Sequence, residues 1–144
     1  MYNASDVLAT VRMLREEHLD VRTVTMGIHL GDCARTGMDD TAGAVTRKIT
    51  SKAANLVRIC DQISTRYGIQ IVNKRLAVSP ASLLLEGRGR TEALRLARAM
   101  DEAAEAVQVD LIGGFTALVQ KGMTSGKQTV LDALPDVLSQ TTRV

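Results

Sequence analysis

Aromatic residues are scarce in this chain of 144 residues, which has two Tyr, one Phe and no Trp. Nucleic-acid-binding proteins commonly stack bases on aromatic side chains and carry an excess of basic residues. Here 18 basic residues are nearly balanced by 16 acidic ones, which gives a net charge of +2. We therefore expect no nucleic-acid partner, and we expect an aliphatic core.

Long apolar runs and paired cysteines are also missing. No run approaches the roughly 20 residues needed to span a bilayer, and the N-terminal segment becomes charged too early for a signal peptide. The two cysteines, Cys33 and Cys60, show neither CxxC spacing nor the pattern of a disulfide framework. We expect a cytoplasmic protein with no membrane partner, and the sequence leaves any cofactor unknown.

What the chain does contain is an alternation of helical and strand patterns. Short stretches rich in apolar residues, two of them also in β-branched ones, predict strands at 20–30, 69–79 and 109–114. Helical periodicity predicts helices at 4–17, 41–67, 91–107 and 125–141. We expect Gly68 to end the long helix and Pro135 to split the last one. The expected inward faces are Val7, Leu8, Val11 and Leu14 in the first helix, and Val45, Ile49, Leu56, Cys60, Ile63 and Tyr67 in the second.

This order predicts a single α/β domain over residues 1–144, in which βα units build a parallel sheet. Strands joined through helices need crossover connections and therefore run parallel. Three parallel strands form a small sheet with exposed edges. Such a sheet would be more stable as part of a larger fold, or in a homo-oligomer.

The carboxyl ends of parallel strands are where α/β proteins usually bind ligands. The segments 29–33, 73–79 and 112–116 follow or form these ends, so we expect them to share one rim. The candidate ligand-binding residues on them, and just beyond the third, are Asp32, Asn73, Arg75, Gly113, Gly114 and Lys121.

The double glycine at 113–114 has two interpretations. It is a tight turn, or it is a loop whose backbone approaches a ligand closely. A short helix starting in "FTALVQK" would offer free amides to an anion in the second case. The stretch matches neither GxxxxGK[ST] nor GxGxxG, so no nucleotide is indicated.

Charged and nucleophilic residues give two more open questions. Alternation along a strand places Asn73 and Arg75 on one face and Lys74 on the other. Arg75 then either contacts an anion or pairs with a loop carboxylate such as Asp32. Cys33 is a weak candidate for a catalytic nucleophile. It forms no recognised metal-ligand spacing with its neighbours, so we expect no metal site.

Four segments carry a family resemblance: "LDVRTVTMGIHLGDC", "KITSKAANLV", "GIQIVNKRLAVSPASL" and "VDLIGGFTALVQKG". Together they resemble the N-terminal signature of the uncharacterised protein family 0210 (domain-of-unknown-function family 711). The resemblance implies a bacterial or archaeal protein whose fold is like the α/β barrel of pyruvate formate-lyase, with no established activity. It also implies that this chain is truncated and covers the N-terminal third of a larger fold.

Three functional hypotheses remain at this point. The first is a protein, enzymatic or not, that binds a small polar or anionic metabolite at the rim of its strands. The second is a regulatory or oligomerising subunit without catalytic activity. The third is an inactive fragment of a longer protein.

Overall fold

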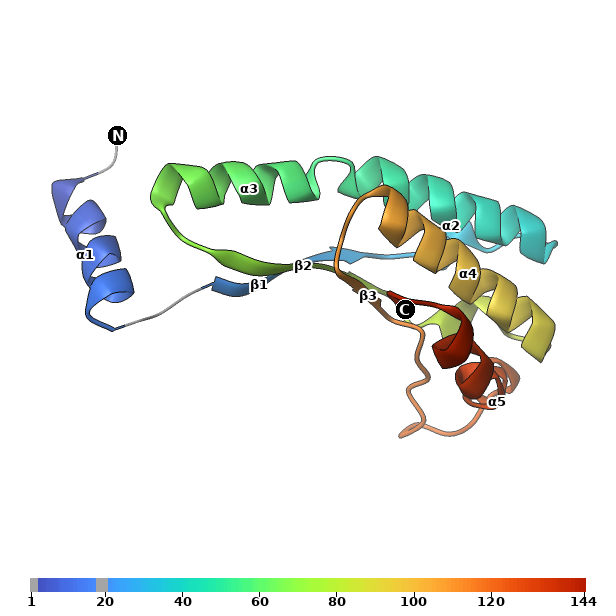
Figure 1. Ribbon diagram of the computed structural model, residues 1–144. Coiled ribbons are helices and arrows are strands. Elements are labelled where there is room, and N and C mark those ends of the chain that lie inside the picture. Colours follow the sequence, from blue (N-terminus) through green and yellow to red (C-terminus); the bar gives the residue numbers. More distant parts are fainter. Residues whose placement is uncertain (1–2, 18–20) are drawn as a thin grey trace.

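The computed structural model describes residues 3–17 and 21–144, which form a mixed α/β fold (Figure 1). Two short 3-10 turns, η1 (Gly31–Cys33) and η2 (Ala81–Leu84), follow the first two strands. The other elements are α1 (Ala4–Arg15), β1 (Val21–Ile28), α2 (Met38–Ala53), α3 (Leu56–Tyr67), β2 (Ile71–Val78), α4 (Arg90–Ala106), β3 (Leu111–Gly113) and α5 (Ser125–Gln140). The start of the first predicted strand, Asp20, lies outside the described residues.

The three strands form one parallel sheet in the order β1-β2-β3. This confirms the predicted parallel α/β arrangement. Helices α2, α3 and α4 lie on one side of the sheet (Figure 1), while α5 packs against α4 and η2. The central strand β2 is therefore flanked on both sides, and β1 and β3 form the edges.

The core between the sheet and the helices is aliphatic, as expected. Leu76 and Ile112 point from the sheet toward Ile49 of α2 and Met100 of α4, and each of these side chains is at most 1% exposed. Burying one such side chain stabilises the fold by about 1.5–3 kcal/mol. Buried alanines in α2 and α4 let these two helices pack closely against each other.

The predicted helix at 41–67 is two helices, so the prediction of one continuous helix is wrong. The chain breaks at Asn55, whose Oδ1 accepts hydrogen bonds from the guanidinium of Arg58. Asparagine weakens a helix interior because its side chain bonds locally. Only the first half of α3 lies over the core, so Ile63 and Tyr67 are exposed rather than inward-facing. Gly68 ends α3 in the left-handed conformation, as predicted.

Two further helix predictions are corrected in part. Helix α1, which the structure describes in full, forms as predicted. None of its residues is buried, so its expected inward face does not pack against the core, and Leu8 is 69% exposed. Pro135 does not split the last helix, because α5 runs through it and is held by the buried side chains of Val130 and Val137 on either side. Within residues 3–17 and 21–144, no helix combines the length and the apolar character that crossing a bilayer requires.

Candidate functional site

The segments that follow the three strands meet at one rim of the sheet, as the sequence predicted. Ser79 N donates to Ile28 O at 3.2 Å, and Leu30 N donates to Ser79 Oγ at 2.9 Å, which joins the ends of β1 and β2. Ala81 N donates to Gly114 O at 2.9 Å, which joins the end of β2 to that of β3. The rim is therefore a continuous hydrogen-bonded surface.

Asp32 lies at this rim, on η1, with its side chain largely exposed. Its carboxylate pairs with Lys48 of α2, and this hydrogen bond lowers the pKa of Asp32. The salt bridge between Asp32 and Arg75 that the sequence left open is therefore not formed. Asp32 instead ties the loop after β1 to the helix that follows it.

Cys33 lies at the end of η1 and is 3% exposed. Burial raises the pKa of its thiol, and the nearby carboxylate of Asp32 adds to that effect. Because the thiolate is the nucleophile, a raised pKa makes Cys33 poorly suited to attack a substrate. In the described part of the chain, no three His, Cys, Asp or Glu side chains are grouped to hold a metal ion.

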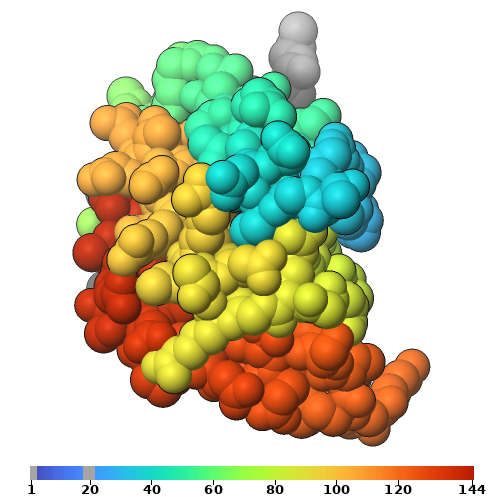
Figure 2. All heavy atoms as spheres, turned by 90° about the vertical axis from the view of Figure 1, so that its right-hand side faces the viewer, coloured from blue at the N-terminus to red at the C-terminus, as the bar shows by residue number. Residues whose placement is uncertain are grey.

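Gly113 and Gly114 lie where β3 passes the end of β2. Gly114 has φ of 125°, and a Cβ there would lie 2.6 Å from Val78 O. This close approach and the positive φ explain why a glycine occupies position 114. Residues 114–124 form a loop, so the short helix in "FTALVQK" that the ligand-loop interpretation invoked does not form. Lys121 is exposed on a turn of this loop, and the chain around residue 120 projects from the body in orange (Figure 2).

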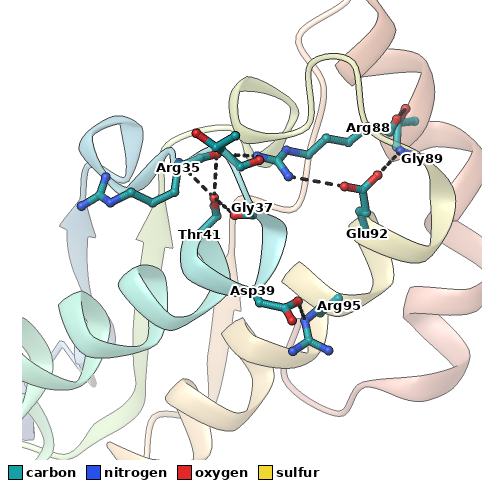
Figure 3. Close-up of polar contacts among 10 residues, drawn as sticks. Arg35, Gly37, Asp39, Thr41, Arg88, Gly89, Glu92 and Arg95 are labelled. Atoms are coloured by element: carbon teal, nitrogen blue, oxygen red, sulfur yellow. Dashed lines mark hydrogen bonds and ion pairs between the residues drawn. The ribbon is translucent and has the colours of Figure 1, made fainter.

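Glutamate side chains bond to the starts of two helices at the rim, α4 and α5. Glu86 accepts hydrogen bonds from Ser125 Oγ at 2.7 Å, from Gly126 N at 3.1 Å and from the hydroxyl of Thr124. These bonds lower the pKa of Glu86, with the Thr124 bond the largest cause. Glu92 Oε2 accepts from Gly89 N at 2.8 Å at the start of α4 (Figure 3). Glu92 thereby makes one half of a capping box, while Gly89 has no side chain to make the other half, so the sequence lacks the full motif.

Arg88 connects two loops of the rim. Its Nη2 donates to Arg35 O at 2.7 Å and to Thr36 O at 3.4 Å, while Nη1 pairs with Glu92 Oε1 at 3.4 Å (Figure 3). Nearby, Thr41 Oγ1 accepts from Arg35 N and donates to Gly37 O. This network holds the β1–α2 loop against the start of α4.

Asn73 and Arg75 do not lie at the rim, in contrast to the sequence prediction. The register pairs Thr23 with Asn73 and Thr25 with Arg75, so both lie on the body of the central strand. The predicted alternation is confirmed, because Lys74 points to the helical side and pairs with Asp61 of α3 at 3.1 Å. Asn73 Nδ2 donates to Arg22 O at 3.4 Å.

The side of the sheet away from α2, α3 and α4 is here called the open face. From Thr23 in β1 and Asn73 in β2 onward, alternation along the strands assigns to it Thr23, Thr25, Gly27, Asn73, Arg75, Ala77, Leu111 and Gly113. Ile71, at the start of β2, falls in the same alternation but is 7% exposed and belongs to the core. None of these residues is acidic. Arg75 sits in the middle, with Thr25 beside it on β1 and Leu111 beside it on β3. The alternation of Thr, Thr and Gly with Val and Met in β1 was the sequence signal for this face.

The Nε of Arg75 is buried and finds no hydrogen-bond partner in the part of the chain that the structure describes. None of the ion pairs among those residues includes Arg75 either. An unpaired buried polar group costs about 1–3 kcal/mol. The site candidates therefore fall into three places: Asp32 and Gly114 belong to the rim, Lys121 to a projecting loop, and Asn73, Arg75 and Gly113 to the open face of the sheet.

Comparison with known proteins places the chain in a family. Residues 12–144 match the family described as "Uncharacterised ACR (DUF711)". The chain belongs to this family. It is 47% identical over 144 residues to a UPF0210 protein of Oleidesulfovibrio alaskensis, and 46% identical over 144 residues to one of Desulforamulus reducens. Both matches cover 100% of this chain and 32% of the relative.

A UPF0210 protein of Lacticaseibacillus paracasei is 50% identical over 135 residues, which are 94% of this chain and 30% of the relative. The family resemblance seen in the sequence is thus confirmed. The chain spans about a third of the length of the curated relatives it matches. The DUF711 family has no established activity.

Proposed function

We propose that this chain supplies part of a cytoplasmic binding site for a small polar or anionic metabolite, and that Arg75 holds the anionic group. The observation that carries the proposal is the buried Nε of Arg75, which has no partner among the described residues. An anion on the open face would satisfy this donor through a charge-assisted hydrogen bond. None of the strand residues that alternation assigns to that face is acidic.

We also propose that the sheet is one arc of a larger barrel, like that of pyruvate formate-lyase, in the longer family members. Two features support this: helices α2, α3 and α4 cover one side of the sheet, and β1 and β3 are edge strands (Figure 1). Closure of such a sheet removes its edges and turns one face inward. The open face would then line an enclosed space, where a charge interacts more strongly than in water.

The proposal is tested by replacing Arg75 with Gln and measuring how anions shift the thermal unfolding of the 144-residue chain. Acetate, phosphate and citrate at equal ionic strength are the probes. The matched control is Arg47→Gln, which removes the same charge from an exposed position of α2 on the helical side. We expect stabilisation of the parent and of the control by at least one anion, and loss of that effect in Arg75→Gln.

Two results would overturn the anion role of Arg75. One is an equal response of all three proteins to every probe. The other is a lower unfolding temperature in Arg75→Gln with its anion response intact, because Arg75 would then act only on stability. A discrete oligomer in sedimentation analysis, together with no response to any anion, would favour the oligomerising subunit instead.

A further inference from the structure

The chemistry around Arg75 narrows the class of ligand, provided that the proposed anion site is correct. The first observation concerns where a phosphate would otherwise bind. Helix N-termini are the usual phosphate positions of α/β proteins, but those at this rim carry acidic residues. Glu86 bonds to the start of α5, Glu92 to that of α4, and Asp39 and Asp40 lie in the first turn of α2.

The second observation is a row of small residues on the open face. Gly27, Ala77 and Gly113 are paired across the three strands, two positions beyond the row of Arg75. Two positions along a strand correspond to about 7 Å. A Cβ at Gly27 would meet no atom within 4 Å, and one at Gly113 would meet only Leu76 O, at 3.9 Å. The space above this row is therefore open, and the floor is nearly flat.

The third observation is the pair of side chains on either side of Arg75. Thr25 offers a hydroxyl on the β1 side, and Leu111, which is 40% exposed, offers an apolar surface on the β3 side. A ligand in this position meets one cation, one hydroxyl and one apolar side chain. That set suits a molecule with a single anionic group and a mostly apolar body.

We propose that the ligand is a small organic acid with one carboxylate. Its carboxylate accepts two hydrogen bonds from the guanidinium edge that includes Nε of Arg75, and its body lies over the row of Gly27, Ala77 and Gly113. A planar carboxylate matches the fork of an arginine. A phosphate ester carries more charge than one arginine neutralises. Among the described strand residues assigned to this face, Arg75 is the one cation, and none of these residues belongs to a helix start.

The test compares two probes that share one flat body, benzoate and phenyl phosphate. Each is titrated into the isotope-labelled chain, and amide chemical shifts are followed by NMR at constant ionic strength. Benzoate should shift the amides of Gly27, Ala77 and Gly113, with phenyl phosphate binding at least about tenfold more weakly, a difference of about 1.4 kcal/mol.

The variant that tests the floor is Gly27→Val. The backbone there is not in the left-handed region and its side-chain space is empty, so a β-branched residue is compatible with the strand. We expect unchanged unfolding and at least about tenfold weaker benzoate binding, the scale of one lost favourable contact. The matched control is Thr23→Val, on the same face two positions before Thr25, which should bind benzoate as the parent does.

The outcomes separate this inference from the proposed function. If phenyl phosphate binds as tightly as benzoate, the carboxylate assignment is wrong. If Gly27→Val leaves benzoate binding unchanged, the placement of the ligand body over Gly27 is wrong. Neither result contradicts an anion site at Arg75, which the Arg75→Gln experiment tests. If neither probe shifts any amide of the open face, the carboxylate assignment is wrong. If, in addition, no probe of the Arg75→Gln experiment stabilises the parent chain, both proposals fail.

Discussion

Gly114 crosses the end of β2 so closely that its α-carbon has no room for a side chain beside Val78. A Cβ on Gly114 would lie 2.6 Å from Val78 O and would overlap a methyl group of the same valine. The turn also needs φ of 125°, which other residues rarely adopt. The position is therefore fixed by sterics and by backbone conformation together.

Replacing Gly114 with Ala should lower the free energy of unfolding by about 2 kcal/mol or more, through strain and overpacking. Urea denaturation measures the change. The control is Gly113→Ala, because the nearest atom to its Cβ is 3.9 Å away and its φ is not positive. That substitution should change stability by less than about 1 kcal/mol. Similar losses in the two variants would contradict this account of the turn.

Glu86 should make stability depend on pH in the acidic range. Its pKa in the folded chain is lowered by hydrogen bonds from Thr124, Ser125 and Gly126. The unfolded chain therefore binds the proton more tightly, and the stabilisation is complete above the ordinary Glu pKa of about 4.3. It disappears as the pH falls through the folded-state pKa.

We expect Glu86→Gln to unfold at a lower temperature than the parent at pH 7, with the difference shrinking as the pH falls below about 4. Thermal unfolding followed by circular dichroism at several pH values measures this. A difference that stays constant between neutral and acidic pH would show that the charge of Glu86 does not stabilise the start of α5.

Arg88 should contribute much more to stability than Arg95, although both pair with a carboxylate near the starts of α2 and α4. The side chain of Arg88 is 14% exposed and donates to two backbone carbonyls as well as to Glu92. Arg95 and its partner Asp39 are 57% and 76% exposed. Arg88→Met should cost about 1.5–3 kcal/mol, and Arg95→Met less than about 1 kcal/mol. Chemical denaturation of both variants measures the two changes in the free energy of unfolding. A larger loss of stability for Arg95→Met than for Arg88→Met would contradict the stronger role given to Arg88.

Cys33 and Cys60 should react slowly with thiol reagents while the chain is folded. Burial raises the pKa of both thiols, so less thiolate is present at any given pH than in a free cysteine. Absorbance after addition of a disulfide reagent at pH 7.5 measures the rate, with the chain in guanidinium as the control. Fast modification of Cys33 in the folded chain would restore it as a candidate nucleophile.

The sequence predicted the order and direction of the strands because βα units leave a strong local pattern. Glycine at position 68 and the β-branched run of β1 are signals of this kind, since backbone preference alone decides them. The break at Asn55 was missed because apolar spacing continues across it, and only a local side-chain bond shows where the helix ends. Pro135 was misjudged because packing on both sides of it outweighs its cost within α5.

The candidate site was predicted less well, and the reason lies in register. The predicted strand at 69–79 already had Asn73 and Arg75 several residues before its end, so their assignment to the rim did not follow from its bounds. The pairing with Thr25 and Leu111, which the sequence does not reveal, shows what lies beside Arg75 on the sheet. Likewise, nothing in the sequence pairs Asp32 with Lys48, which lies sixteen positions away on the next helix.

Helix α3, which follows the break at Asn55, is packed against the core less extensively than α4. Helix α4 buries seven of its residues, whereas α3 buries only Leu56 and Cys60. Segments with few buried contacts open more often than the rest of a protein. Amide protons of α3 should therefore exchange with solvent deuterium well before those of α4, so that the end of the molecule near Tyr67 opens without global unfolding.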